Sequence, residues 1–455
     1  MATGKTMDLT QGSILKKMLR FTIPIVLGNL LQQLYTAADR IVVGRFSLDG
    51  TTALAAIGAT ASAINLVIGL FTGIAMGVNV ICANLLGSGD RENLRKSMHT
   101  SIVVSVLCGL FLCFTGILIS PAIMRWMDTP QSVIRLSSLY MQIYFLGVPA
   151  SLLYNFGAGI LRAHGDTKRP MFILMLSGVV NVVLNVVFVV VFRMSVEGVA
   201  IATVVSQYIS AGMILRILFE KKGEYHLRVR ELKIDKTQLI AIIRIGIPSG
   251  LGSVVFSASN VMLQSSVNSF DNAAIIAGRT AASDINVLIY QIQSGFLAAC
   301  ISFSGQCYGA RDYKRIDKVA TTATMLCIGI MGVLIAVCTI FAPEVIRLFN
   351  TDPEVVSYGA TILKINCLGL IAYIPAENYL GCSRGMKRGM APTILNIIAI
   401  CLPRLIWILG VFPAHREIGI LYLCYPISWG CSTLVQVVYY YVIRKKLDRQ
   451  LQTAN

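Results

Sequence analysis

Isolated polar side chains inside long apolar segments are the residues of this chain that could do chemistry. Gln32, Tyr35 and Asp39 are spaced i, i+3 and i+7, which places all three on one face of a helix. Two later segments of the same half add amide and hydroxyl groups: Asn181, Asn185 and Thr203. Carboxylate, amide and hydroxyl oxygens suit a small hard cation, but such groups also bond neighbouring helices together. Asp39 could instead pair with the adjacent Arg40, so both a cation site and a structural role stay open.

A second set of polar residues lies in the other half of the chain. Asn260, Gln264 and Asn268 are spaced i, i+4 and i+8, and we expect this stripe to line a cleft. Two acids, Asp284 and Glu377, also fall inside apolar segments, where a charge costs at least ~2.5 kcal/mol and needs a reason. Cation binding is one reason. The structural alternatives are ion pairs: Arg279 with Asp284, and Glu377 with Lys364 or Arg404.

Cysteine and histidine spacing gives no sign of a metal centre. The 12 cysteines lie almost entirely inside apolar runs without a close metal-type pair, and the 4 histidines are far apart in sequence. We therefore expect no resident metal and no cofactor. A catalytic site would need paired acids, a metal cluster or a nucleophile, and the scattered acids supply none. The chain is not expected to be an enzyme.

Composition indicates which elements must hold these residues. The 455 residues are 55% hydrophobic and only 13% charged, with a mean hydropathy of +0.71, whereas soluble domains carry about 25% charged residues. Uncharged runs of about 20 residues or more recur, and such a run crosses a ~30 Å hydrocarbon core as a helix. The predicted fold class is therefore an all-α membrane protein in contact with the lipid bilayer.

Twelve transmembrane helices are predicted, and their loop charges orient them. The spans are 20–43, 53–85, 97–120, 134–160, 170–192, 197–219, 238–266, 273–307, 319–342, 355–382, 390–413 and 417–443. The side that carries the N-terminus holds 29 of the 39 Lys and Arg residues, and the opposite loops hold 8. The positive-inside rule then places both termini in the cytoplasm of a multi-pass cell-membrane protein. This topology explains the net charge of +17, which is scattered over short segments, so no nucleic-acid partner is expected.

The two halves of the chain repeat each other. Gly87-Ser-Gly-Asp90-Arg91 corresponds to Gly309-Ala-Arg-Asp312-Tyr313, an offset of 222. Three further matches share that offset: Pro121 with Pro343, Arg162 with Arg384, and Pro170 with Pro392. In the same register Asn155 corresponds to Glu377. Six spans per half relate the halves by an axis along the membrane normal. The predicted domains are an N-lobe (1–219), a cytoplasmic linker (220–236) and a C-lobe (237–455), facing each other across a cleft.

Several motifs resemble the MATE (multidrug and toxic compound extrusion) transporters, and most closely their prokaryotic DinF-type branch. The motifs are Gln32-Gln-Leu-Tyr35-Thr-Ala-Ala-Asp39-Arg after Pro24, Gly157-Ala-Gly-Ile-Leu-Arg162-Ala-His-Gly165, Gly198-Val-Ala-Ile-Ala-Thr203 and Ile247-Pro-Ser-Gly-Leu251. The resemblance covers nearly the whole chain. It implies a V-shaped pair of six-helix bundles that exports small amphipathic, often cationic, compounds in exchange for H⁺ or Na⁺. We expect the transporter to act as a monomer.

Taken position by position, the resemblance implies that Asp39 is the cation-coupling carboxylate of the family's first helix. It places four more residues in the same network: Gln32, Tyr35, Asn181 and Thr203. Asn185 departs from the pattern, because the branch usually has a second aspartate there. An amide cannot take up a proton, so a relay of two carboxylates is not available, although the Asn185 carbonyl can still bind Na⁺.

Two other functions were weighed against multidrug antiport. A flippase or exporter of lipid-linked or polyanionic substrates would need several basic residues at mid-membrane to bind a pyrophosphate, and only Lys364 and Arg404 lie there. A non-transport intramembrane enzyme or receptor is the second alternative, and the internal repeat favours transport over it. The exported compound and the choice between H⁺ and Na⁺ are left open by the sequence.

Overall fold

The structure is a computed structural model that describes residues 7–47, 50–220, 225 and 227–454, and every long element in these residues is a helix. The first half holds α1 (Ile14–Phe46), α2 (Gly50–Gly87), α3 (Arg91–Trp126), α4 (Gln131–Ala163), α5 (Lys168–Asn185) and α6 (Val196–Leu218). The second half holds α7 (Lys236–Asn268), α8 (Ala273–Gly309), α9 (Tyr313–Ile340), α10 (Ala342–Arg347), α11 (Pro353–Gly385), α12 (Met390–Ile406), α13 (Ile418–Tyr422) and α14 (Cys424–Ala454).

Eleven stretches of helix in the described residues are long and apolar enough to cross a membrane. They match the second to twelfth predicted spans. The first predicted span is α1, which is 33 residues long and would also reach across a bilayer, but Arg20, Asp39 and Arg40 make it more polar. The prediction of an all-helical membrane protein is confirmed, and most helices extend beyond the predicted spans.

The chain divides into two compact units. Unit 1 holds Met1–Asp8 and Ile23–Gly250, and unit 2 holds Leu9–Thr22 and Leu251–Asn455. The boundary between the units crosses two helices, and in each helix it lies within three residues of an Ile-Pro pair: Ile23-Pro24 in α1 and Ile247-Pro248 in α7. Each proline removes a backbone hydrogen bond from its helix. The lobes predicted from the sequence follow the boundaries of the internal repeat. The compact units differ from them because the first parts of α1 and α7 each pack within the unit of the other half.

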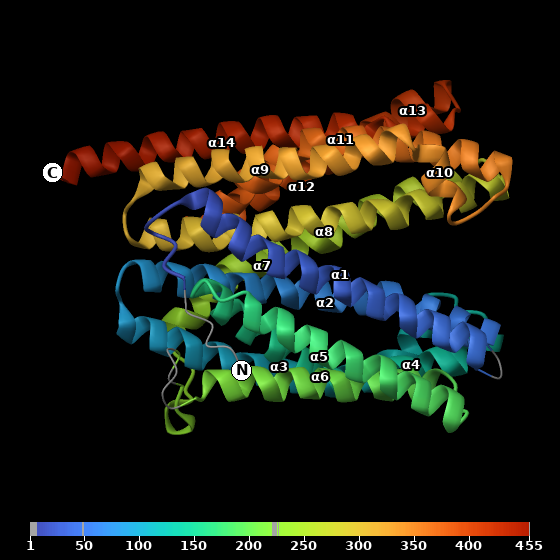
Figure 1. Cartoon of the computed structure of the whole chain (residues 1–455), viewed down its shortest axis with the longest axis horizontal. Helices are drawn as coiled ribbons and strands as arrows, with labels where there is room; N and C mark the ends of the chain where they lie inside the picture. The colour runs from blue at the N-terminus through green and yellow to red at the C-terminus, as the bar shows by residue number, and fades with distance from the viewer. Residues whose placement is uncertain (1–6, 48–49, 221–224, 226, 455) are drawn as a thin grey trace. The chain divides into compact units, whose positions relative to one another are not determined.

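Each unit is built around one central helix. In unit 1, α4 packs against α2, α3 and α6, and Figure 1 shows these helices side by side. In unit 2, α11 packs in the same way against α8, α9 and α14 (Figure 1). Since α4 and α11 are repeat counterparts, the three-dimensional packing follows the internal repeat of the sequence.

Glycines bring the first part of α7 against α2 within unit 1. Gly73 and Gly77 of α2 face Gly246 and Gly250 of α7, and a Cβ atom at Gly73 would lie 2.3 Å from the backbone nitrogen of Gly250. Both pairs are spaced i, i+4, the small-xxx-small pattern that lets helix backbones approach closely in membranes. A side chain at any of these positions would push the two backbones apart.

The segment before α1 is held within unit 2 by polar contacts. The backbone N–H of Leu9 donates to Gln306 Oε1 at 2.8 Å. Arg315 donates from Nε to the Leu9 carbonyl at 3.1 Å, and from Nη2 to the carbonyls of Gln11 and Gly12 at 2.8 and 2.9 Å. The Leu9 side chain is fully buried. The segment from Leu9 to the start of α1 is therefore part of unit 2.

Matched local structure supports the repeat at several positions. Asp90 and Asp312 both cap a helix, accepting from the backbone N–H groups of Asn93 and Arg315 at 3.1 and 3.0 Å. The preceding residues, Gly89 and Arg311, both have positive φ. In addition, α5 and α12 both end in a π-helical turn, Val186–Val191 and Trp407–Val411. The repeated Gly-x-x-Asp motif is thus a helix-start signal in each half.

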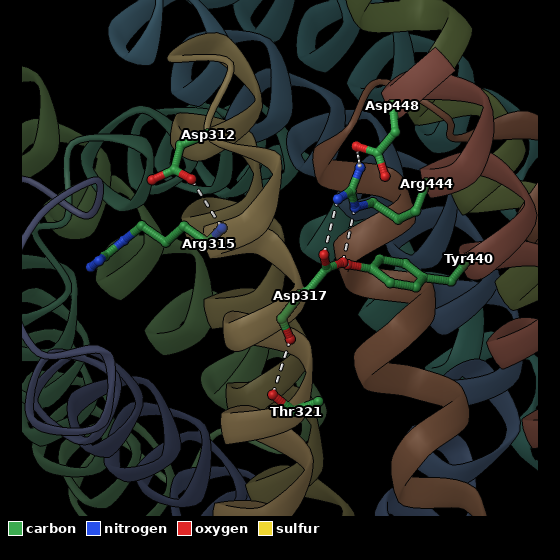
Figure 2. A network of polar contacts seen from close by, with 7 residues as sticks. All are labelled: Asp312, Arg315, Asp317, Thr321, Tyr440, Arg444 and Asp448. Atoms are coloured by element: carbon green, nitrogen blue, oxygen red, sulfur yellow. Dashed lines mark hydrogen bonds and ion pairs between the residues drawn. The ribbon is translucent and has the colours of Figure 1, made fainter. Parts of the chain in front are cut away.

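A charged network joins α9 to α14 at one end of unit 2 (Figure 2). Arg444 donates from Nε and Nη2 to the two carboxylate oxygens of Asp317, each at 2.9 Å, and its Nη1 contacts Asp448 at 3.1 Å. The Tyr440 hydroxyl donates to Asp317 at 2.6 Å. The Arg444 side chain is only 6% exposed, so the two-point contact with Asp317 satisfies a largely buried charge.

Candidate cation site and substrate contacts

Four of the predicted residues meet in unit 1. The Asn185 amide donates a hydrogen bond to Asp39, and its nitrogen also lies 3.4 Å from Asn181 Oδ1. The Asn181 amide lies 3.5 Å from the Thr203 hydroxyl. Asn185 is fully buried, whereas Asp39 is half-buried. Helices α1, α5 and α6 therefore bring one carboxylate, two amides and one hydroxyl into a continuous polar chain, which we call the Asp39 cluster.

The Asp39 cluster has spare acceptor capacity for a cation. Asn185 Oδ1 is buried without a hydrogen-bond partner, an arrangement that costs free energy. The Thr203 hydroxyl donates to the Val199 carbonyl at 2.9 Å and accepts from the Asn181 amide, so one of its two oxygen lone pairs remains available to a ligand. One formal negative charge and several oxygen acceptors fit a monovalent hard cation or a proton. The adjacent Arg40 makes no ion pair with Asp39 among the described residues.

An apolar shell surrounds this end of unit 1. Buried side chains that form one packed cluster include Val42, Val43, Ala53, Val189, Val196 and Val199. Val42 and Val43 follow Asp39 on α1, Val189 follows Asn185 in the π-helical turn, Val196 and Val199 precede Thr203 on α6, and Ala53 is on α2. A charge here is poorly solvated, so the electrostatic free energy of the Asp39 carboxylate changes strongly when a cation binds or leaves. Asn185 also ends α5 where the π-helical turn begins, a backbone irregularity that is frequent at functional sites.

Two tyrosines near Asp39 were missed by the sequence analysis. Tyr140 and Tyr144 of α4 both interact electrostatically with Asp39, and their rings lie 6.3 Å apart. Tyr140 is buried within the apolar shell. Their i, i+4 spacing in an apolar span was the available signal, since it places two hydroxyl groups on one helix face.

The predicted stripe on α1 separates into different environments. The Tyr35 hydroxyl donates to the Met175 carbonyl at 3.1 Å, and its ring occupies the space beside Gly178, where a Cβ atom would clash. Gln32 is exposed and lines a pocket of about 80 Å³ together with Asn155. The Asn155 amide donates to the Ser151 carbonyl at 2.8 Å. Gln32 and Asn155 therefore share a pocket that can hold several water molecules, apart from the Asp39 cluster.

Glu377 is the most buried acid of unit 2 that the sequence analysis singled out. It is 4% exposed, and the Tyr373 hydroxyl donates to its carboxylate at 2.5 Å. Its basic neighbour is Arg384, its helix companion seven residues on, which itself donates to Thr393 Oγ1 at 3.1 Å. Among the described residues, Glu377 makes no ion pair with Lys364 or Arg404.

Asp284 and the α7 stripe lie differently from the expectation of a single polar lining. Asp284 is exposed and, among the described residues, makes no ion pair with Arg279. Gln264 donates to Asn268 at 2.6 Å, which confirms the i, i+4 relation of those two. Asn260 instead accepts from Arg404 Nη1 at 3.4 Å. Within the described part of the chain, no three His, Cys, Asp or Glu side chains form a metal-type group.

Comparisons with known proteins agree with this architecture. The MatE family model matches residues 24–187 and 248–407, so each matched segment begins at a repeated proline. A probable multidrug resistance protein of Bacillus subtilis, YoeA, is 27% identical over 97% of this chain and 96% of its own length, and a second, YpnP, is 30% identical over 79% and 80%. The multidrug export protein MepA of Staphylococcus aureus is 24% identical over 95% of each chain.

Solved structures share the same fold. An outward-facing multidrug resistance MATE family transporter of the MOP superfamily superposes with a TM-score of 0.90 at 23% identity, covering 99% of this chain and 100% of that chain. A MATE crystal structure in a straight conformation gives the same TM-score at 24% identity. The family match covers most of the sequence and both repeats, and the resemblance noted in the sequence motifs is confirmed. The chain belongs to the MatE family of multidrug efflux transporters.

Proposed function

We propose that this transporter is an antiporter that exports amphipathic organic compounds in exchange for H⁺ or Na⁺, and that the coupling ion binds at the Asp39 cluster. The observation that carries the proposal is the single carboxylate of Asp39, bonded to buried Asn185 on another helix. Asn185 Oδ1 has no partner, so the cluster offers a cation one charge and an unused carbonyl oxygen.

Coupling follows from competition for this one charge. When the cation is bound, the Asp39 carboxylate is neutralised and the oxygens of Asn185, Asn181 and Thr203 can turn towards the ion. When the cation leaves, the carboxylate depends on the Asn185 N–H alone. The two states differ in charge inside an apolar shell, and a difference of this kind can bias the helices α1, α5 and α6 between two arrangements.

The test replaces the carboxylate while keeping its shape. In inverted membrane vesicles or proteoliposomes with separately imposed H⁺ and Na⁺ gradients, we expect Asp39→Asn to lose gradient-driven ethidium transport. The protein should still fold and bind ethidium. Asp128→Asn is the matched control, because Asp128 is an exposed acid of the same unit in a loop with positive φ, a conformation that Asn tolerates. Wild-type transport rates in Asp39→Asn would refute the assignment.

A further inference from the structure

Among the described residues, Arg404 is the largest of the fully buried side chains, and it makes no ion pair with an acid there. It is 2% exposed, and its described contacts are with uncharged groups. Nε donates to Ser428 Oγ at 3.1 Å and Nη1 to Asn260 Oδ1 at 3.4 Å. Nη2 is buried without any hydrogen-bond partner. A buried cation left unpaired is strongly unfavourable, so its presence in a membrane helix needs an explanation.

The neighbours of Arg404 leave one edge of the guanidinium free. The ring of Tyr425 lies 4.3 Å from the guanidinium carbon and the ring of Phe256 lies 5.2 Å from it. These aromatic faces stabilise the cation through its flat sides. The Tyr425 hydroxyl also lies 3.4 Å from Asn260 Oδ1, which fixes the ring beside the arginine. The remaining Nη2 edge of the guanidinium presents N–H donors of the kind that bind a carboxylate.

Other unpaired donors surround the same place in unit 2. Arg279 lies beside both Tyr422 and Tyr425, and its Nε atom is buried without a partner. The indole N–H of Trp429, whose ring lies 5.0 Å from that of Tyr425, is a further buried donor without an acceptor. Arg404 Nη2, Arg279 Nε and the Trp429 indole N–H lack acceptors here, and an incoming anion would supply one.

We propose that Arg404, supported by Asn260, Tyr425 and Ser428, binds the carboxylate of an aromatic organic anion or zwitterion. This rests on the proposed efflux function and names a class of substrate for it. A permanent acidic partner would compete with such a ligand, so an arginine held by neutral groups suits an anion that comes and goes. The aromatic rings of Phe256 and Tyr425 suit the body of the ligand, and Phe256 is 36% exposed.

The depth of Arg404 agrees with a transport site. It lies 14 residues beyond the first residue of α12, Met390, which corresponds to about 21 Å of helix. Under the predicted topology α12 starts at the cytoplasmic side, so the guanidinium lies in the outer half of the membrane. At 2% exposure the side chain does not reach water in the described fold, so snorkelling does not explain it.

The test compares two probes of matched shape, one with a carboxylate and one with a neutral carboxamide. Isothermal titration of the purified full-length protein in detergent would use 4-phenylbenzoate and its neutral analogue 4-phenylbenzamide. We expect the wild type to bind the carboxylate at least tenfold more tightly than the amide. Arg404→Gln should weaken carboxylate binding at least tenfold. Arg404→Lys should weaken it less, because a lysine keeps the positive charge but lacks the planar set of N–H donors of the guanidinium.

Controls separate this proposal from folding and from the proposed function. Arg416→Gln removes an exposed arginine of the same unit that donates hydrogen bonds to Ser269, and this variant should bind both probes as the wild type does. Gel filtration and ethidium binding check that each Arg404 variant is folded. Equal binding of the two probes by the wild type, no binding of either, or unchanged carboxylate binding by folded Arg404→Gln would overturn the inference. Absence of ethidium transport by the wild type would instead refute the proposed function.

Discussion

Replacing Asn185 by aspartate puts a second carboxylate at the centre of the Asp39 cluster. The Asn185 amide bonds directly to Asp39, so the new carboxylate would occupy nearly the same place and replace a hydrogen-bond donor with a like charge. The substitution keeps the size of the side chain. Since Asn185 is fully buried, the new charge has little water around it.

The size of the effect follows from the geometry. Two unit charges about 4 Å apart at an effective dielectric of about 20 repel by about 4 kcal/mol. A cation bound between the two carboxylates relieves that repulsion, which corresponds to about a thousandfold higher affinity. Asp39 is only half-buried, so solvent screening reduces the effect, and we expect a gain between about tenfold and a thousandfold.

Transport in proteoliposomes measures this gain. If Na⁺ is the coupling ion, Asn185→Asp should lower the Na⁺ concentration for half-maximal transport at least tenfold. If H⁺ is the coupling ion, the pH profile should move to higher pH by at least one unit and become steeper between about pH 5 and 8. Asn185→Ala is the paired variant and should reduce transport only moderately, because Asp39 remains. No change in either dependence for Asn185→Asp would mean that residue 185 does not face Asp39 in the working transporter.

Two further predictions concern topology and stability. A cysteine introduced at Arg230, in the linker, should resist a membrane-impermeant thiol reagent in intact cells, whereas a cysteine introduced at Asn350 should react. The parent protein without the added cysteine is the control. The opposite labelling pattern would reverse the predicted orientation. Asp317→Asn should lower the apparent Tm in detergent by several degrees, because charge-assisted bonds to Arg444 contribute about 1.5–3 kcal/mol each. Asp448→Asn removes one contact to a carboxylate that is 55% exposed and should change Tm by a degree or less; equal effects of the two substitutions would contradict the two-point contact.

The helices and the repeat could be predicted from the sequence because they depend on local patterns. Apolar length defines a membrane span whatever its neighbours are, and the Gly-x-x-Asp motif signals a helix start through a hydrogen bond only three residues away. The grouping of Asp39 with Asn181, Asn185 and Thr203 could also be predicted from the sequence. A carboxylate and amides inside apolar helices need partners, and the family resemblance indicated which helices supply them.

Partners that depend on tertiary packing were not predictable in the same way. For Glu377 the sequence left open a cation-binding role or an ion pair with Lys364 or Arg404, and in the structure Tyr373 and Arg384 of its own helix lie next to it. The glycine pairs of α2 and α7 carried a readable i, i+4 spacing, yet a spacing on one helix does not name the helix that fits against it. The attachment of Leu9 to Arg315 left no periodic signal, because its bonds run to backbone carbonyls that every residue possesses.

Buried groups without partners distinguish the two candidate sites by the kind of ligand each lacks. Near Asp39 the unpaired atom is an acceptor, Asn185 Oδ1, next to a carboxylate, and a cation satisfies both. Around Arg404 the unpaired atoms are donors, including Arg404 Nη2 and Arg279 Nε, and an anion satisfies them. A repeated fold would place equivalent groups in both halves if packing alone selected them. The opposite polarity of the two sets instead suits separate tasks, with the coupling ion in unit 1 and an acidic group of the exported compound in unit 2.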